Sequence, residues 1–486
     1  MTRPMIEDAR IQQLNQQPIR LEGRRYVLYW MQQSQRAEYN HALEYAIEQA
    51  NDLGLPLLVV FGLMDDYPEA NLRHYTFLLE GLQDVQQSLR ARGIKMVVRH
   101  GAPDEVALAL GREASLIVCD RGYLRIQRAW RKRVAEGAAC RVMQVESDVV
   151  VPIEVVSQKR EYAARTIRPK IHRHLHPFLV PPPFFGLNQP SLHLEVEGLD
   201  LSDIQHVLNH LKLERTVGPV SHLYVGGESE AKRIFSEFLE EKFANYDRNR
   251  NHPETDDVSH MSKYLHFGHI SPLYLALQLL KLQGRPDIAQ ENIDSYIEEL
   301  IVRRELAMNF VYYTPDYDAY TCLPNWAAKT LAEHRDDHRA YLYTREELEE
   351  ANTHDEYWNA AMKEMKYTGY MHNYMRMYWG KKILEWSRTP EEAFATTLAL
   401  NNKFFIDGRD ANSYTGVAWI FGVHDRAWRE RAIFGKIRYM NAAGLKRKCD
   451  IQGYIKKVDR LIDIKPNPED TRLRIRENLH DQGHLH

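Results

Sequence analysis

Hydrophobic positions follow two different rhythms in the two halves of the 486-residue chain. Between about residues 25 and 150, short β-branched runs alternate with amphipathic helical stretches. The runs are RYVLYW (25–30), PLLVVF (56–61), IKMVVR (94–99), SLIVCD (115–120) and CRVMQV (140–145), and helices are expected over 36–51, 70–92 and from Pro103 onward. Strands that alternate with helices of this length predict a parallel sheet with helices on both faces.

The second half has apolar positions at helical spacing and few candidate strands. Helices are expected over 228–245, 271–283, 291–312, 355–366, 370–387, 390–400 and 427–443. Between the halves, HLHPFLVPPPFFGLNQP (174–190) has prolines that argue against regular structure. The sequence therefore predicts an α/β domain over 20–175, a connector over 176–215, an all-α domain over 216–462 and a tail over 463–486.

Composition narrows the class of protein. The formal net charge is -3, so any nucleic-acid surface must be local. The apolar run at 53–64 is too short to span a bilayer, and the N-terminus lacks the apolar core of a signal peptide. The four cysteines are widely separated, which favours neither a zinc site nor a disulfide framework. These features indicate a soluble cytoplasmic protein with no membrane partner and no metal.

The α/β half carries no specific ligand signature. No G-x-G-x-x-G motif follows a predicted strand, so a dinucleotide fingerprint of the NAD type is absent. A sheet with helices on both faces still offers a ligand crevice at the carboxyl ends of its strands. The sequence does not identify the ligand of that crevice.

Two stretches of the helical half contain candidate polar groups. Ser259 and Ser262 come at the mouth of a predicted helix, where hydroxyls and free backbone N–H groups can seat a phosphate or simply cap the helix. Ser271, before Pro272, is expected to cap the next helix. Glu299 stands four residues before Arg303, a spacing that is typical of an ion pair on a solvated helix face.

The segment 401–440 is the richest in polar residues around glycines, which is more typical of a site than of a plain loop. It contains Asn401, Asp407, Asp410, Asn412 and Trp419. Over 401–460 the chain has thirteen Lys or Arg against six Asp or Glu, interleaved with aromatic residues. Such a pattern suits a phosphate backbone with unstacked bases, and a solvated basic helix is the alternative.

The stretch YMHNYMRMYWGKKILEWSRTP (370–390) holds two indoles beside a cation. Trp379 and Trp386 are seven residues apart, which is about 10 Å and nearly two turns of a helix, so they share one stripe near Arg376. Core packing and a path for electrons are both compatible with this spacing.

At this point the chain resembles class II cyclobutane pyrimidine dimer photolyases, within the photolyase/cryptochrome superfamily. The motifs that carry the resemblance run in order along most of the chain: SQKREYAARTIRPKI (157–171), YLHFGHIS (264–271), ELIVRREL (299–306), THDEYWNAA (353–361), MRMYWGKKILEW (375–386), DGRD (407–410), GVHDRAW (422–428) and GKIRYM (435–440). The resemblance implies a Rossmann-like N-terminal domain, which can carry an antenna chromophore of the deazaflavin or folate type. It also implies a helical domain that holds FAD in a folded conformation, active as FADH⁻.

The same resemblance assigns the cofactor residues. Ser259 and Ser262 are similar to the hydroxyls that seat the flavin diphosphate, so phosphate binding replaces plain capping as the expectation. Arg376 and Asp407 resemble the family's ion pair beside the isoalloxazine. Asn401 matches the asparagine that faces flavin N5, where an amide can hydrogen-bond any protonation state. Asp410 and Asn412 are assigned to the same site.

The resemblance also orders the indoles as an electron route. Trp379 is expected nearest the flavin, Trp358 next and Trp386 last. On one straight helix, Trp358 would lie about 30 Å from Trp379. A break at Thr368–Gly369 is therefore expected to fold two helices together.

The expected substrate is ultraviolet-damaged DNA with its pyrimidine dimer flipped out of the duplex. Glu299 resembles the acid that hydrogen-bonds the damaged base, and Met377 and Trp419 resemble the residues that pack against it. The residues expected to fill the vacated space or grip phosphates are Arg426, Trp428, Arg429 and Arg438. One departure is Arg303, where some members of the family carry a tryptophan in the dimer pocket.

The sequence thus predicts a monomeric, DNA-associated repair enzyme that splits cyclobutane pyrimidine dimers by light-driven electron transfer. A cryptochrome-like photoreceptor is disfavoured by Glu299, by Trp419 and by the lack of a long C-terminal extension. A (6-4) photolyase is disfavoured by the class II motifs. A non-catalytic nucleic-acid-binding module is the remaining alternative, and it would lack bound flavin.

Overall fold

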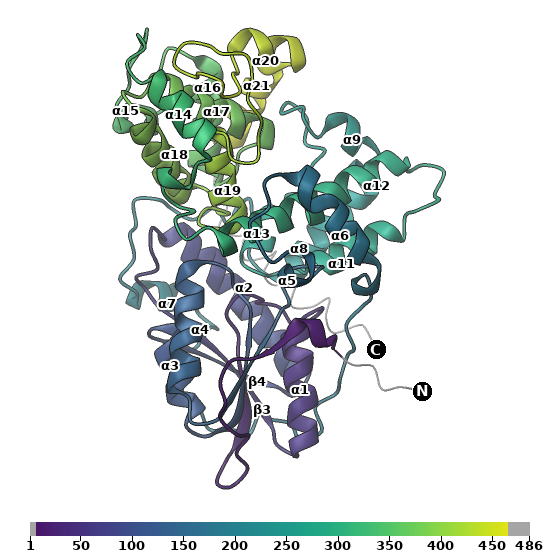
Figure 1. The fold of residues 1–486 in the computed structure, drawn as a ribbon. Helices are drawn as coiled ribbons and strands as arrows, with labels where there is room; N and C mark the ends of the chain where they lie inside the picture. The colour runs from purple at the N-terminus through teal and green to yellow at the C-terminus, as the bar shows by residue number, and fades with distance from the viewer. Residues whose placement is uncertain (1–5, 465–486) are drawn as a thin grey trace.

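The computed structural model describes residues 6–464, so almost all of the predicted tail lies outside the described residues. A six-stranded sheet forms the centre of the N-terminal part, in the order β1-β6-β5-β2-β3-β4 (Figure 1). Every strand pair in it is parallel except β1 with β6. The order reverses between β2 and β5, and at such a switch point the carboxyl ends of the strands open a crevice.

The elements of this part follow the predicted alternation of strands and helices. The strands are β1 (Ile11–Gln13), β2 (Tyr26–Trp30), β3 (Leu57–Leu63), β4 (Lys95–His100), β5 (Ala114–Asp120) and β6 (Arg141–Val145), and η1 (Asp8–Arg10) precedes them. The helices are α1 (His41–Leu53), α2 (Leu72–Ala91), α3 (Pro103–Gly111), α4 (Arg125–Gly137), α5 (Ile153–Val156), α6 (Ala164–Phe178) and α7 (Ile204–His210). Apolar side chains of α1 and α2 cover one face of the sheet, and those of α3 and α4 cover the other.

The C-terminal part is helical. Its first elements are α8 (Glu228–Glu237), η2 (Phe238–Lys242), η3 (Phe243–Asn245), α9 (Tyr246–Asn249), α10 (Ser262–His266), α11 (Pro272–Leu280), α12 (Gln290–Ile297), η4 (Glu298–Arg303) and α13 (Arg304–Tyr313). The others are η5 (Tyr320–Cys322), α14 (Asn325–Glu333), α15 (Arg345–Glu349), α16 (Glu356–Thr368), α17 (Asn373–Trp386), α18 (Pro390–Phe404), α19 (Ala411–Ile420), α20 (Ala442–Lys448) and α21 (Ile451–Ile462).

These helices form two packed groups rather than one. One apolar cluster joins α13 to α21, and a second joins α6, α8, α11 and α12. Figure 1 shows the first group at the upper left and the second at the right, with α13 and α19 between them. The helical part therefore offers an interior boundary along which a ligand can be enclosed.

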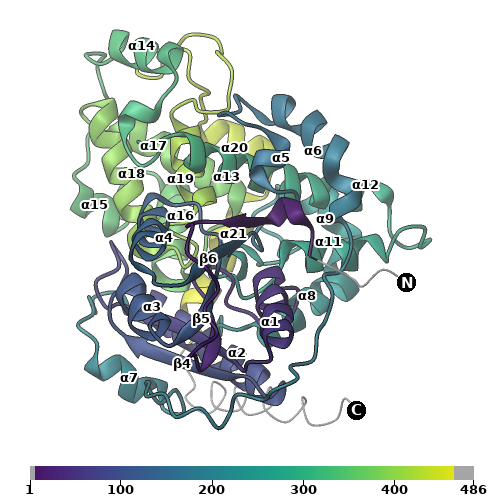
Figure 2. The same cartoon turned by 60° about the horizontal axis from the view of Figure 1, so that its bottom comes forward.

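Helix α6 differs from the prediction in two ways. It continues to Phe178 and contains Pro169 and Pro177, although irregular structure was expected from residue 174. Burial of Ile167, Ile171 and Phe178 in the second apolar cluster offsets the hydrogen bonds that the prolines remove. Figures 1 and 2 both show α6 beside α12 of the helical part, although the predicted α/β domain extends to residue 175.

The prediction of a helix over 427–443 is wrong. Residues 421–441 form an irregular loop, and α20 begins only at Ala442. Phe434 and Ile437 of this loop are buried in the first apolar cluster, and their spacing imitates a helix. The loop's backbone is bound by α14 and the turn after it: the Ile433 N–H donates to Asp337 at 2.7 Å, and the Lys436 N–H donates to Thr330 at 3.1 Å. Tertiary hydrogen bonds therefore replace helical ones.

Buried polar contacts connect the two parts of the molecule. Arg73 of α2 donates to the backbone carbonyls of Met365, Lys366 and Phe404, with distances of 3.3, 2.7 and 2.7 Å. Arg36, after β2, donates to the Gly268 carbonyl at 3.1 Å. Side chains of the sheet domain therefore bind the backbone of the helical part directly. Within residues 6–464, no helix has the length and apolar character needed to cross a membrane.

Candidate active site

A cavity of about 380 Å³ lies between the two groups of helices. Its walls come from α9, the 258–262 turn, η4 and α13 on one side and from α17, the end of α18 and α19 on the other. This volume is in the range of about 300–1,000 Å³ that is usual for small-molecule sites. The cavity brings together most of the site residues predicted from the sequence: Ser259, Ser262, Glu299, Arg376, Met377, Trp379, Asn401, Asp407, Asp410, Asn412 and Trp419.

An ion pair spans the cavity wall between α17 and the turn after α18. The Arg376 guanidinium donates to both oxygens of Asp407, at 3.1 and 3.0 Å, and lies 3.9 Å from the centre of the Phe405 ring. Burial raises the pKa of Asp407, but the Arg376 charge and its hydrogen bonds outweigh burial, and the net shift is downward. Asp407 is therefore a carboxylate that fixes Arg376 in place.

Asn401 presents one defined atom to the cavity. Its Nδ2 donates to Asn402 Oδ1 at 3.0 Å and to the hydroxyl of Ser413. Both amide hydrogens are thus used within the protein, and the side chain is only 5% exposed. Oδ1 is therefore the atom that can accept a hydrogen bond from a ligand.

The two serines lie where the prediction puts them, at the entry to a helix. Ser262 is the first residue of α10, and its hydroxyl also interacts with Asp407. Ser259 accepts a hydrogen bond of 2.7 Å from the Tyr296 hydroxyl. Neither side chain caps α10, whose N-cap residue is Met261. Ser271 does cap α11, as expected, because its hydroxyl accepts from the N–H groups of Leu273 and Tyr274.

Glu299 is bound by a residue that the sequence did not single out. Arg250 donates to Glu299 Oε1 at 2.5 Å and to the Ser295 hydroxyl at 2.7 Å. The expected pair between Glu299 and Arg303 is absent, and Arg303 donates to Glu298 at 2.9 Å instead. The cause is the π-helical turn η4, in which the partner of a residue shifts from the fourth to the fifth position along the chain.

The three indoles form one continuous buried chain. Helices α16 and α17 are separated at Gly369, whose φ of 71° ends α16 with a left-handed residue, close to the break expected at Thr368–Gly369. Trp358 Nε1 donates to the Trp379 carbonyl at 2.9 Å, and the rings of Trp358 and Trp386 meet with centroids 5.6 Å apart. Trp379 faces the cavity, whereas Trp358 and Trp386 lie behind it.

The remaining predicted residues do not line the cavity. Arg426 and Arg438 place their guanidinium groups over the Trp428 ring, with 4.9 and 4.4 Å between each Cζ and the ring centre. Asp425 joins this group through Arg438 at 3.0 Å and through the Trp428 indole N–H at 3.3 Å. Arg429 is exposed and takes no part in the cluster. The irregular loop thus carries a cationic and aromatic cluster, formed by Arg426, Trp428 and Arg438, beside the cavity.

Sequence reasoning missed several cavity residues. Tyr246 begins the short helix α9, Arg250 directly follows that helix, and His424 comes from the loop. Burial lowers the pKa of His424 to about 4, so the ring is neutral; Nδ1 donates to the Tyr162 carbonyl and Nε2 has no protein partner among the described residues. The only signal for Arg250 was the polar run NYDRNRNH (245–252), which has no periodicity to distinguish its members.

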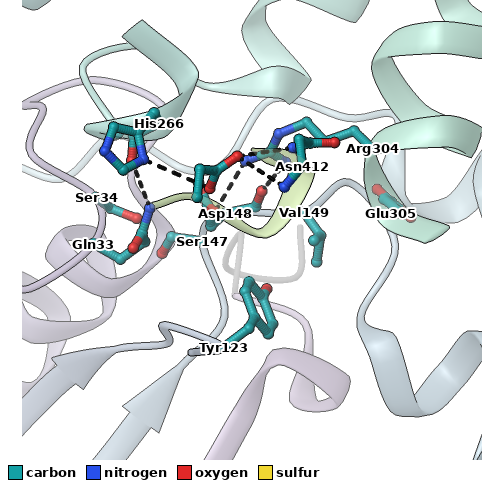
Figure 3. Close-up of polar contacts among 12 residues, drawn as sticks. Gln33, Ser34, Tyr123, Ser147, Asp148, Val149, His266, Arg304, Glu305 and Asn412 are labelled. Atoms are coloured by element: carbon teal, nitrogen blue, oxygen red, sulfur yellow. Dashed lines mark hydrogen bonds and ion pairs between the residues drawn. The ribbon is translucent and has the colours of Figure 1, made fainter. Parts of the chain in front are cut away.

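Figure 3 shows a group of polar residues between the two parts of the molecule, here called the polar seam, and two of the residues drawn, Arg304 and Asn412, also line the cavity. Gln33 and Asp148 come from loops after strands, and His266 and Arg304 come from helices. Gln33 donates to the His266 carbonyl at 3.0 Å, and Arg304 pairs with Asp148 at 3.0 Å. On the cavity side, Asp410 caps α19 through the Asn412 N–H. Asp410 also lies 3.7 Å from His266 Nδ1 of the seam, and the Asn412 amide donates to Asp410 at 3.0 Å.

A second cavity, of about 120 Å³, opens at the carboxyl ends of β2 and β3, where the sheet predicts a crevice. Its lining includes Gln32, Gln35, Leu63 and Trp130 from the α/β part and Arg409 from the helical part. Gln32 Nε2, Gln35 Oε1 and the Nε and Nη1 atoms of Arg409 are buried and have no hydrogen-bond partner among the described residues. These orphaned polar atoms fit a ligand with a polar edge.

Comparisons with known proteins agree with this architecture. The DNA photolyase family model matches residues 27–186. A deoxyribodipyrimidine photo-lyase from Methanothermobacter thermautotrophicus is 51% identical, over 94% of this chain and 100% of that protein, and one from Oryza sativa is 40% identical over 90% of this chain and 88% of that protein. An archaeal photolyase from Sulfolobus tokodaii, solved with two FAD molecules, has the same fold (TM-score 0.67, 16% identity, 90% of this chain and 91% of that one).

The extent of these matches decides the family. Relatives at 51% and 40% identity cover nearly the whole chain, so the likeness extends through both the sheet and the helices that form the large cavity. The chain belongs to the DNA photolyase family.

Proposed function

We propose that this protein is a class II photolyase that repairs cyclobutane pyrimidine dimers in DNA under light. The observation that carries the proposal is that one cavity is lined by a cation–carboxylate pair, a buried amide and the first indole of the chain, and also by Glu299, Met377 and Trp419. The photoreceptor alternative does not need a substrate wall of this kind.

A flavin fits the donors that line the cavity. Ser259 and Ser262 offer hydroxyls for a diphosphate, and Arg376 offers a cation for the negative charge of a reduced ring. The indole N–H of Trp379 is buried without a partner among the described residues. When bound as FADH⁻ and excited by light, the flavin supplies the electron that opens the cyclobutane ring, and the electron returns to it afterwards.

The chain's own residues hold the cofactor and control its charge. Asp407 fixes Arg376 by two hydrogen bonds, so the guanidinium needs no reorganisation when charge moves nearby. Asn401 Oδ1 can accept a hydrogen bond from a protonated ring nitrogen. A carboxylate at the same position would repel the electron density that the reduced ring carries.

On the substrate side, the walls suit a dimer that has left the duplex. Base flipping is the general route by which enzymes such as photolyases reach a base, and it costs least for a poorly paired lesion. Trp419 and Met377 supply apolar contact, and Glu299 supplies a hydrogen-bonding group. The cluster of Trp428, Arg426 and Arg438 is suited to fill the space that the dimer leaves in the duplex, and Arg429 is suited to contact a phosphate. All of these groups come from one chain, which supports a monomer as the active form.

The function is tested by repair under blue light. Reduced protein is illuminated with ultraviolet-damaged oligothymidylate, and the recovery of thymine absorbance is measured. We expect recovery in the wild type, and a fall of about tenfold in Glu299→Gln, because a hydrogen bond to a charged group contributes about 1.5–3 kcal/mol. Asn401→Asp is expected to fail as well, because the new carboxylate opposes reduction of the flavin.

The matched control is Glu113→Gln, which breaks the exposed ion pair with Arg25 at the far end of the α/β part. Its repair rate should equal that of the wild type. A wild-type protein that binds flavin but does not restore thymine absorbance would favour a photoreceptor, and a protein without flavin would favour a simple nucleic-acid-binding module.

We further propose that the second cavity holds the antenna chromophore, of the deazaflavin or folate type. Its orphaned polar atoms and its position at the strand ends support this assignment. Leu63→Trp fills the cavity, so we expect the purified variant to lose the second chromophore while keeping its flavin. Absorption spectra and mass spectrometry of the released chromophores measure both. Retention of the second chromophore in the variant would place the antenna elsewhere.

A further inference from the structure

Arg303 lines the large cavity, and only one of the five N–H donors of its guanidinium has a hydrogen-bond partner among residues 6–464. Its Nε donates to Glu298 at 2.9 Å, and Glu298 is held in turn by Arg168 of α6 through bonds of 2.9 and 2.7 Å. Neither Nη atom of Arg303 has a hydrogen bond to another residue in the range 6–464. The guanidinium is thus fixed at one edge, and its fork of Nη donors remains available.

The π-helical turn η4 creates this arrangement. In an α-helix, side chains three and four residues apart are neighbours. In the π-helical turn η4, the side chain of a residue lies over the residue five positions further along, which pairs Glu298 with Arg303. Glu299 is consequently free to face the cavity and to bind Arg250. The two neighbouring carboxylates of this turn therefore have different roles: Glu298 anchors Arg303, and Glu299 faces the cavity.

The charge around Arg303 favours an anion. Arg168 and Arg303 share the single carboxylate of Glu298, and Glu299 is already paired with Arg250. Arg304 turns away to Asp148. His424, on the same wall, is neutral. Arg250 and Arg303 of the cavity wall, together with Arg168 behind Glu298, thus make three cations against two carboxylates.

Depth in the cavity tells which part of a substrate meets Arg303. Trp379 and Asn401 are 1% and 5% exposed, whereas the side chains of Arg303 and Glu299, which lie nearer the opening, are 39% and 38% exposed. An extruded dinucleotide enters bases first and stays joined to the duplex by its backbone. Its bases therefore reach the buried end of the cavity, and the phosphodiester between them stays near the opening.

We propose that Arg303 binds the phosphodiester that links the two damaged pyrimidines, through its two Nη atoms, and that Arg168 and Glu298 position it. This inference rests on the proposed repair function. A guanidinium fork matches two phosphate oxygens better than a lysine ammonium does. Arg303 then positions the extruded dinucleotide by its backbone, which is a different task from the stacking that an aromatic residue would perform.

The test is a double-mutant cycle between protein and DNA, measured as equilibrium binding of the flavin-loaded protein in the dark. The DNA carries one dimer, with either its native linking phosphate or a neutral methylphosphonate at that position. A third DNA has the methylphosphonate at the next phosphate along. The proteins are the wild type, Arg303→Gln, Arg303→Lys and the remote control Arg25→Gln.

We expect the neutral linkage to weaken wild-type binding about tenfold, and Arg303→Gln to weaken binding of native damaged DNA by a similar factor. The variant should lose nothing more from the neutral linkage, but should still lose affinity from the flanking one. Arg303→Lys should recover part of the loss, and Arg25→Gln should behave as the wild type.

Two results would overturn the assignment. Additive losses for Arg303→Gln and the neutral linking phosphate would show that the two groups do not meet. Non-additivity with the flanking phosphate instead would move Arg303 to a neighbouring nucleotide. Failure of the repair proposal is distinguishable from both with a fourth, undamaged DNA of the same sequence, because the wild type would then bind damaged and undamaged DNA equally.

Discussion

Trp379→Phe is expected to abolish light-driven reduction of bound oxidised flavin while leaving repair by already reduced enzyme intact. Trp379 is the only one of the three indoles that lines the large cavity. Trp358 donates a hydrogen bond to the backbone carbonyl of Trp379, and the ring of Trp386 packs against the ring of Trp358. Phenylalanine keeps much of the packing but is far harder to oxidise, so the route would lose its first donor. Repair uses the flavin's own electron and does not need the route.

The measurement is the absorbance of oxidised flavin during illumination with a thiol reductant present. The same sample, reduced chemically, is then assayed for thymine recovery. Trp30→Phe is the matched control, because Trp30 is also completely buried but lies in the sheet. Normal photoreduction in Trp379→Phe would show that electrons enter by another path, and lost repair in the reduced variant would show damage to the site itself.

Arg376→Ala is expected to remove most of the bound flavin. Asp407 is 8% exposed and would lose the cation that keeps it ionised. Breaking a buried ion pair by removing one partner costs about 3–5 kcal/mol, and the Arg376 side chain is 23% exposed, so the lower end applies. The variant should therefore show both a lower melting temperature and a low ratio of flavin to protein absorbance.

The double variant Arg376→Ala/Asp407→Ala separates these two effects. It leaves no unpaired carboxylate, so the melting temperature should recover, but the site still lacks its cation and should stay poor in flavin. Arg125→Ala is the control, since Arg125 forms a similar two-bond pair with Asp318 on the surface. Full flavin occupancy in the double variant would remove this ion pair from the cofactor site.

Much of the fold could be predicted because its signals are local. The β-branched runs that became β2, β3 and β5 are buried along their whole length, and those that became β4 and β6 are buried in part, so each reads as a mainly apolar run. Strand β1 escaped prediction because Ile11–Gln13 has one apolar residue and pairs only at the edge of the sheet. The loop over 421–441 escaped it because its order comes from α14 and the turn after it, nearly a hundred residues earlier in the chain.

The candidate site divides in the same way. Arg376 and Asp407 stand in motifs that carry the resemblance, Asn401 lies six residues before the second of these motifs, and the structure brings all three to one cavity. The partners of Glu299 and Arg303 could not be predicted, because α-helical spacing pairs residues four positions apart, whereas η4 is a π-helix and pairs residues five positions apart. Arg250 could not be predicted because its role depends on α9 packing beside α12, a contact between elements more than forty residues apart in sequence.

The contacts of Arg73 affect how the molecule comes apart. Its guanidinium, on α2 of the sheet domain, is the buried partner of three carbonyls at the ends of α16 and α18. Separating the halves would break these hydrogen bonds and expose to water the apolar side chains that pack across the boundary, such as Phe77 of α2, so each half alone would lose part of its stabilisation. The two halves are therefore not autonomous folding units, and denaturation should proceed as one cooperative transition.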